Sequence, residues 1–218
     1  MEHTYYSREY TKKEKLANWF YYNKWWLVVG AVLIWIVGTM LWNVLGVGKA
    51  KPDYRVAYVG MTRLSDSCVS ALEEGLSALG TDLNGDGKVI VQLTQHITTA
   101  SQNAEGMIYG YAAEVTVLAD ITEGESYFFL LDDPQSFQKN YQILAHLDGS
   151  MPENDDFEAM DKVYAWNSLP SLASIESEEM ELLSTLYLGR RYFYDPSTAG
   201  DLSGMEAFWE ILTRGAEE

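Results

Sequence analysis

The sequence lacks the residues for an intramolecular disulfide, because Cys68 is the only cysteine among 218 residues. Any folded part of the chain must therefore be held together by an apolar core. Catalytic motifs are missing as well. His96 and His146 are the only histidines after the N-terminal region, and neither belongs to a Gly-x-Ser-x-Gly, His-Glu-x-x-His or phosphate-loop motif. We therefore expect a protein that is not an enzyme.

Positive charge is scarce beyond the first quarter of the chain. From Pro52 onward, 8 Lys and Arg stand against 29 Asp and Glu, a balance of −21. A domain of this charge is repelled by nucleic acid and by anionic lipid. We therefore expect no nucleic-acid partner.

Charge is absent altogether from Trp25 to Gly48. Residues 25–47 supply the roughly 20 apolar residues with which a helix crosses about 30 Å of hydrocarbon. Trp25 and Trp26 at one end, and Trp42 near the other, suit the two membrane interfaces. The run is too long for a cleaved signal peptide, so we predict an uncleaved signal anchor that contacts the lipid bilayer through residues 25–47.

Basic residues are more frequent before the apolar run than after it. The preceding flank holds Arg8, Lys12, Lys13, Lys15 and Lys24, whereas the following flank holds Lys49, Lys51 and Arg55. This bias predicts a single-pass protein of the cell membrane with a cytoplasmic N-terminus and an extracellular C-terminal domain. The predicted organisation is a cytoplasmic basic-aromatic stub that lies as a helix at the inner leaflet (1–24), a transmembrane helix (25–47), a linker (48–53) and an extracytoplasmic α/β domain (54–218).

The outer part alternates strand-like and helix-like patterns. Strands are predicted over 54–61, 88–96 and 126–131, because these segments are rich in β-branched and aromatic residues. Helices are predicted between and after them, from apolar residues that recur on one face. The first has Val69, Leu72, Leu76 and Leu79, the second has Met107, Tyr111, Val115 and Leu118, and the third begins at Asp133-Pro134 with Phe137, Tyr141 and Leu144 as its buried stripe.

This order predicts an α/β fold, a single three-layer-like domain with a mainly parallel sheet. The remaining part is less regular. We expect a strand within 182–194, and a helix preceded by a capping box from Ser203 to Glu206.

One loop resembles the first half of a calcium-binding loop. Asp82, Asn84 and Asp86 place oxygen atoms at alternate positions ahead of Gly87 and Lys88. The second half departs from the pattern, since Leu93 stands where a bidentate glutamate is expected. Two interpretations remain open: a structural calcium site formed by Asp82, Asn84, Asp86 and Lys88, or a tight turn of the kind that Asn, Gly and Asp favour.

Ligands of open parallel sheets gather beyond the carboxyl ends of the strands. Thr62, His96, Asp132 and Asp133 are therefore candidate ligand-binding residues. Three of them also have a simpler explanation: Asp132 lies in a solvated loop, His96 lies at the end of a strand, and Asp133 caps a helix.

Arg190 and Arg191 form the one adjacent basic pair of the outer domain. They are candidates for binding an anionic ligand or partner. The alternative is that they protect an exposed strand edge from pairing with other chains.

The segment from Tyr54 to Phe137, with its run from Ala113 to Leu130, resembles the first lobe of extracellular solute-binding proteins. Leu186 to Tyr194 and the following helix are similar to the crossing into the second lobe of that family. The chain as a whole also resembles uncharacterised single-pass membrane proteins of Gram-positive gut bacteria, which have an aromatic-basic stub and an Asp-rich turn. These resemblances imply an outer domain that binds a ligand, although the length leaves room for one lobe and a remnant.

Together, these features predict a membrane-anchored extracytoplasmic domain that binds a partner without catalysis. A membrane or envelope protein is the expected partner, such as a component of a transporter or an envelope assembly. The alternative is a tethered receptor for a small solute.

Overall fold

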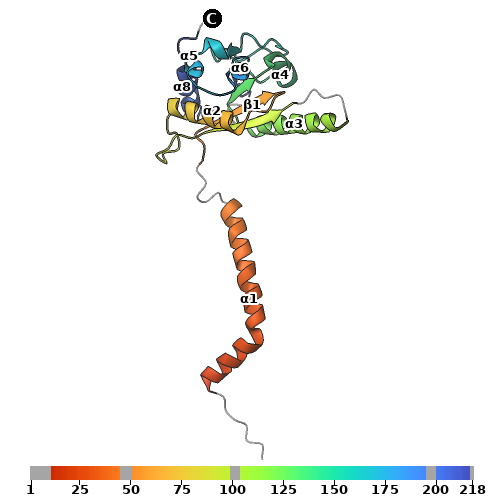
Figure 1. Cartoon of the computed structure of the whole chain (residues 1–218), viewed down its shortest axis with the longest axis vertical. Coiled ribbons are helices and arrows are strands. Elements are labelled where there is room, and N and C mark those ends of the chain that lie inside the picture. The colour runs from red at the N-terminus through yellow and green to blue at the C-terminus, as the bar shows by residue number, and fades with distance from the viewer. Residues whose placement is uncertain (1–10, 45–50, 99–103, 195–199, 217–218) are drawn as a thin grey trace, which may run out of the picture. The chain divides into compact units, whose positions relative to one another are not determined.

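The structure is a computed structural model that describes residues 11–44, 51–98, 104–194 and 200–216, with residues 42–44 and 104–109 described as backbone only. The chain divides into two compact units, residues 1–50 and residues 51–218. Figure 1 traces the elements of both.

In the first unit, the described residues after Thr11 form one helix, α1 (Lys12–Val44), which runs from part of the predicted stub into the predicted span without a break. Its stretch from Lys12 to Leu41 is long and apolar enough to cross a membrane. Its apolar side chains are exposed, with Ile34 75% and Trp35 69% accessible. A core helix of a soluble domain would bury such residues. Residues 45–50, which include the end of the predicted span and half of the predicted linker, lie outside the described residues.

The second unit is an α/β domain built on a five-stranded sheet in the order β2-β1-β3-β5-β4. Strand β1 pairs in parallel with β2 and β3, whereas β5 is antiparallel to both β3 and β4. The strands are β1 (Tyr54–Gly60), β2 (Val91–Ile97), β3 (Phe128–Leu131), β4 (Val163–Ala165) and β5 (Tyr187–Arg190).

The prediction of a mainly parallel sheet is therefore wrong, and the sheet is mixed. Helices α2 and α3 connect the first three strands, and such crossover connections allow neighbouring strands to run parallel. After β4 the chain passes through short helical turns and returns as β5 between β3 and β4, running against both. The expectation that Arg190 and Arg191 protect a strand edge is also wrong, because β5 is an interior strand.

Helices cover both faces of the sheet, as the three-layer prediction requires. One face packs against α2, α5, α6 and α8 in the larger core, and the other packs against α3 and α4 in a smaller core. The helices are α2 (Asp66–Leu79), α3 (Ala104–Glu123), α4 (Pro134–Tyr141), η1 (Trp166–Ser168), α5 (Pro170–Ala173), α6 (Met180–Leu183) and α8 (Ser203–Leu212).

Two predicted helices form where expected, although Leu144 lies after the end of α4, in a bridge to Arg191, and not on its buried stripe. In α2, Leu72 and Leu76 are buried as the periodicity indicated, and Gly80 is the C-cap. In α4, the Asp133 side chain accepts a hydrogen bond from the Ser136 amide, and Pro134 occupies the first turn.

The predicted face of α3 is wrong. Tyr111, Val115 and Leu118 are exposed by 71%, 50% and 56%, whereas Val117 and Asp120 are buried. The side chain of Met107 lies outside the description. The sheet thus contacts a narrow, partly polar side of α3, and the most apolar side faces away.

The capping box before α8 does not form either. Ser203 is the first helical residue and makes no side-chain cap, while its amide donates to Asp201 Oδ1 at 3.0 Å. Glu206 is unavailable for capping, because its carboxylate accepts from Tyr127 and Arg190. Phe208, Trp209 and Leu212 nevertheless pack on the sheet.

Candidate functional site

The carboxyl ends of β1 and β3 border a cleft of about 260 Å³ between α3 and α4. We call it the acidic cleft. It includes the predicted ligand-binding residues Asp132 and Asp133 but neither Thr62 nor His96. The lining residues are Val59, Met61, Thr98, Glu114, Asp132, Asp133, Ser136, Phe137, Asn140 and Tyr141.

Three carboxylates line the acidic cleft: Glu114 from α3, and Asp132 and Asp133 from the connection between β3 and α4. Asp132 Oδ2 accepts from the Met61 amide at 2.6 Å, which joins the ends of β3 and β1. Hydrogen bonds from the hydroxyl and the amide of Ser136 lower the pKa of Asp133. Burial, and to a lesser extent the charge of Glu114, raises the pKa of Tyr141. Among the described lining residues there is no Lys or Arg, so the cleft suits a cationic or hydroxylated group.

His96 lies beneath α3 rather than in the cleft. Its Nδ1 is 3.1 Å from Thr116 Oγ1, and its Nε2 is 3.5 Å from Asp120 Oδ2. Asp120 also accepts from the Ser126 hydroxyl at 2.7 Å and from its amide at 3.0 Å. Burial raises the pKa of Asp120, but the contact with His96 and the hydrogen bonds from Ser126 outweigh burial, and the pKa lies below its ordinary value. This buried polar group attaches α3 to β2.

Thr62 contributes its backbone rather than its side chain. Its carbonyl accepts a hydrogen bond from the Tyr58 hydroxyl at 2.6 Å. Burial, with the charges of Asp132 and Glu179, raises the pKa of Tyr58 to about 12. The Thr62 residue itself is exposed at the turn after β1.

The predicted calcium loop forms an exposed turn whose side chains accept from its own backbone. Asp82 accepts from Gly85 and Gly87, Asn84 accepts from Asp86, and Asp86 accepts from Lys88. Gly85 and Gly87 have φ of 74° and 83°, which favours glycine. This geometry agrees with the tight-turn interpretation. The carboxylates of the loop still have lone pairs that could bind a cation.

Asp53 supports this loop from the domain interior, a role that the sequence analysis missed. Its carboxylate accepts from the amides of Leu83, Asn84 and Ile90 at 2.8, 3.1 and 2.8 Å. These bonds outweigh burial, which acts in the opposite direction, and lower the pKa of Asp53.

Arg190 and Arg191 are both buried, with 4% and 7% exposure. Arg190 pairs with Glu206, donates to the Leu147 carbonyl at 3.0 Å and lies over the Trp209 ring. Arg191 donates to the Ile121 carbonyl at 2.9 Å, near the C-terminal end of α3. The two side chains therefore point to different partners.

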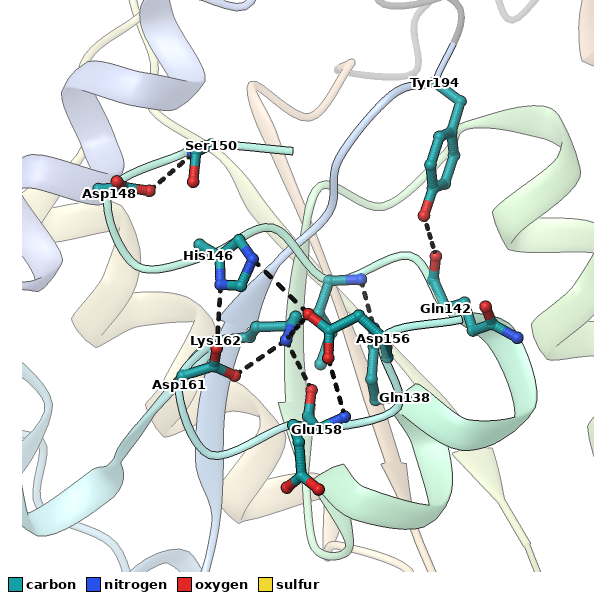
Figure 2. Close-up of polar contacts among 11 residues, drawn as sticks. Gln138, Gln142, His146, Asp148, Ser150, Asp156, Glu158, Asp161, Lys162 and Tyr194 are labelled. Carbon is teal, nitrogen blue, oxygen red and sulfur yellow. Dashed lines mark hydrogen bonds and ion pairs between the residues drawn. The ribbon is translucent and has the colours of Figure 1, made fainter. Parts of the chain in front are cut away.

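A further cluster, drawn in Figure 2, joins His146, Asp156, Asp161 and Lys162. Lys162 is fully buried, and its Nζ lies 2.8 Å from Asp156 Oδ2, 2.9 Å from Asp161 Oδ1 and 2.7 Å from the Glu158 carbonyl. His146 Nδ1 is 3.1 Å from Asp161 Oδ2. Sequence reasoning missed this cluster, because its members show no local motif.

Three of these side chains, His146, Asp156 and Asp161, are spaced as metal ligands are. The bond from Lys162 is the main cause of the lowered pKa of Asp156, and the two aspartates raise the pKa of Lys162 against the effect of burial. The ammonium already offsets one of the two carboxylate charges and contacts both groups. The cluster is thus best explained as the attachment of the loop before β4.

Comparison with family models, with curated proteins and with solved structures finds no match to this chain.

Proposed function

We propose that this chain is a single-pass membrane protein with a cytoplasmic N-terminus, whose extracytoplasmic α/β domain binds a protein partner and does not catalyse a reaction. The long apolar α1 supports the anchor. The basic residues before it and the acidic balance after it support the orientation.

The exposed side of α3 is the observation that carries partner binding. Tyr111, Val115 and Leu118 follow the spacing i, i+4, i+7 and form one apolar stripe, which we call the outer stripe of α3. Contiguous exposed apolar surface on a soluble domain commonly takes part in an interaction. The spacing suits a partner helix or an apolar groove.

The negative charge of α3 limits which kinds of partner could bind its outer stripe. The sequence of α3 contains four acidic residues and no Lys or Arg. Helices that lie on membranes typically carry basic residues on their polar side, so a lipid surface suits α3 poorly. A second copy of the domain also has a charge balance of −21, so the two copies would repel each other. We infer a protein surface with an apolar centre and a rim of Lys or Arg.

Photocrosslinking in native membranes tests this proposal on the full chain. A photoreactive amino acid at Val115 should give a discrete adduct with another protein, and Leu118→Glu should abolish it. Higher salt should weaken it, because rim charges are screened. The same amino acid at Ala78, exposed on α2, is the matched control and should give no such adduct. Adducts with lipid or with a second copy only, or adducts indifferent to Leu118→Glu, would contradict the proposal.

The acidic cleft favours a second candidate, a tethered receptor for a small cationic solute. Its volume of about 260 Å³ lies just below the usual range for ligand pockets, so only a small solute such as an amine would fit. The test is thermal unfolding of the full chain in detergent with 1,4-diaminobutane. Saturable stabilisation that Glu114→Gln removes would favour this candidate, and a flat response would exclude it.

A further inference from the structure

A second cavity, of about 200 Å³, lies at the opposite end of β3 from the acidic cleft. It is located where β3 begins and β5 ends, since the Arg191 amide donates to the Tyr127 carbonyl at 2.9 Å. We call it the arginine cavity. Its lining residues are Tyr127, Ala145, Gly149, Arg191, Tyr192, Phe193, Leu202 and Glu206.

The two charged side chains that line the arginine cavity differ in their partners. Glu206 is the one carboxylate among the described lining residues, and it is already paired with Arg190 and hydrogen-bonded to the Tyr127 hydroxyl. Arg191 takes part in none of the ion pairs between described residues. Arg191 is thus the one charged residue of the described lining without an ion-pair partner, and the Asp120 carboxylate acts on it only at longer range.

The hydrogen bonding of Arg191 is incomplete. A guanidinium has five donors, and this one uses two, toward the carbonyls of Ile121 at 2.9 Å and Ser126 at 3.5 Å. Its Nε has no partner in the structure, although the residue is only 7% exposed. Its hydrogen bonds reach only neutral carbonyl oxygens, and a carboxylate beside it would supply a charged acceptor.

The remaining walls favour an anion with a small apolar body. Phe193 lies 4.1 Å from the guanidinium carbon to its ring centroid, and Tyr127 and Tyr192 add two further rings. The nearby Glu206 carboxylate repels a dianion more strongly than a monoanion.

We propose that the arginine cavity binds a small organic monocarboxylate, with Arg191 as its charged donor and the aromatic rings around its apolar part. Arg191 offers the fork geometry that a carboxylate accepts in bidentate fashion. The site is separate from the outer stripe of α3 and from the acidic cleft, so it goes beyond the proposed function.

Isothermal titration calorimetry of the full chain in detergent, at constant chloride, tests the proposal with benzoate and inorganic phosphate as probes. Benzoate should bind saturably and phosphate at least tenfold more weakly. Arg191→Lys keeps the positive charge but removes the two parallel N–H donors of the guanidinium, so it should weaken benzoate binding about tenfold. Arg63→Lys, exposed at the turn after β1, is the matched control and should change nothing.

Because Arg191 also contacts the end of α3, a second variant separates binding from folding. Leu202→Phe fills the cavity without touching the guanidinium chemistry and should abolish the benzoate heat while thermal unfolding stays cooperative. Absence of saturable benzoate heat in the parent chain, binding that survives Leu202→Phe, or equal affinity for phosphate would each overturn the proposal. Leu118→Glu should leave benzoate binding intact, which keeps this result independent of the crosslinking result.

Discussion

Helices α2 and α3 both carry an apolar stripe in a domain of strongly negative balance, and only α2 turns its stripe toward the sheet. Cys68, Leu72 and Leu76 of α2 are at most 3% exposed and belong to the larger core. On α3, Val117 enters the smaller core, while Val115 and Leu118 remain at least half exposed. The two helices thus differ in what attaches them to the sheet.

The attachment of α3 is polar. Asp120 binds Ser126 and faces His96 of β2, and all three are buried. Rotating α3 to bury its outer stripe would gain on the order of 1 kcal/mol for each half-exposed apolar side chain. The rotation would leave these polar groups unpaired, at about 1–3 kcal/mol each and more where charge is involved. The polar attachment therefore determines which side of α3 faces the sheet.

The largest expected effect compares one substitution on the two helices. Leu72→Ala should lower the free energy of unfolding by about 3 kcal/mol, because it leaves a cavity in the larger core. Leu118→Ala should change it by less than about 0.5 kcal/mol, because that side chain is already largely solvated. Urea unfolding of the full chain in detergent, followed by near-ultraviolet circular dichroism, measures both. Equal losses would show that α3 packs through its outer stripe.

An intermediate effect is expected for the polar attachment. Asp120→Asn should cost about 2 kcal/mol, since it removes the charge that Ser126 and His96 contact. The control is Glu123→Gln, because Glu123 is exposed near the end of α3. This substitution should change the free energy of unfolding by less than about 0.5 kcal/mol. The same urea experiment applies. If Asp120→Asn left the free energy of unfolding unchanged, apolar contacts alone would hold α3 against the sheet.

The cost of Asp120→Asn should depend on pH. The pKa of Asp120 is lowered in the folded chain, so its carboxylate contributes stability above the unfolded value of about 4. That contribution is lost as the pH falls through the folded-state pKa. The difference between parent and variant should therefore be constant from pH 5 to 7 and shrink toward pH 3. A difference that grows on acidification would contradict the assignment of Asp120 as the stabilising carboxylate.

The smallest effect concerns the loop from Asp82 to Lys88, which connects α2 to β2. With a dissociation constant near 1 mM, 10 mM calcium should stabilise the domain by about 1.4 kcal/mol. Calorimetry with calcium should show heat that Asp82→Ala and Asp86→Ala abolish, with magnesium as the control ion. If parent and variants give the same flat traces, the loop is a turn supported by Asp53 and nothing more.

Local patterns were sufficient for most individual elements. The apolar run of α1, the spacing of Leu72 and Leu76, and the Asp133-Pro134 start of α4 each depend on neighbours within a few residues. Asp132 and Asp133 were also placed correctly at the carboxyl edge, because they directly follow β3. Glu114 and Tyr141 were not foreseen in the acidic cleft, since only the packing of α3 and α4 brings them there.

By itself, the sequence determined a long apolar N-terminal helix, an acidic α/β domain and the positions of its first three strands, because chain periodicity and composition are local quantities. Only the tertiary structure decided the antiparallel insertion of β5, the outward side of α3 and the partners of Arg190, Arg191 and Lys162. These depend on contacts between residues far apart in the chain. Their free energies are set by burial and by hydrogen-bond partners that no local pattern contains.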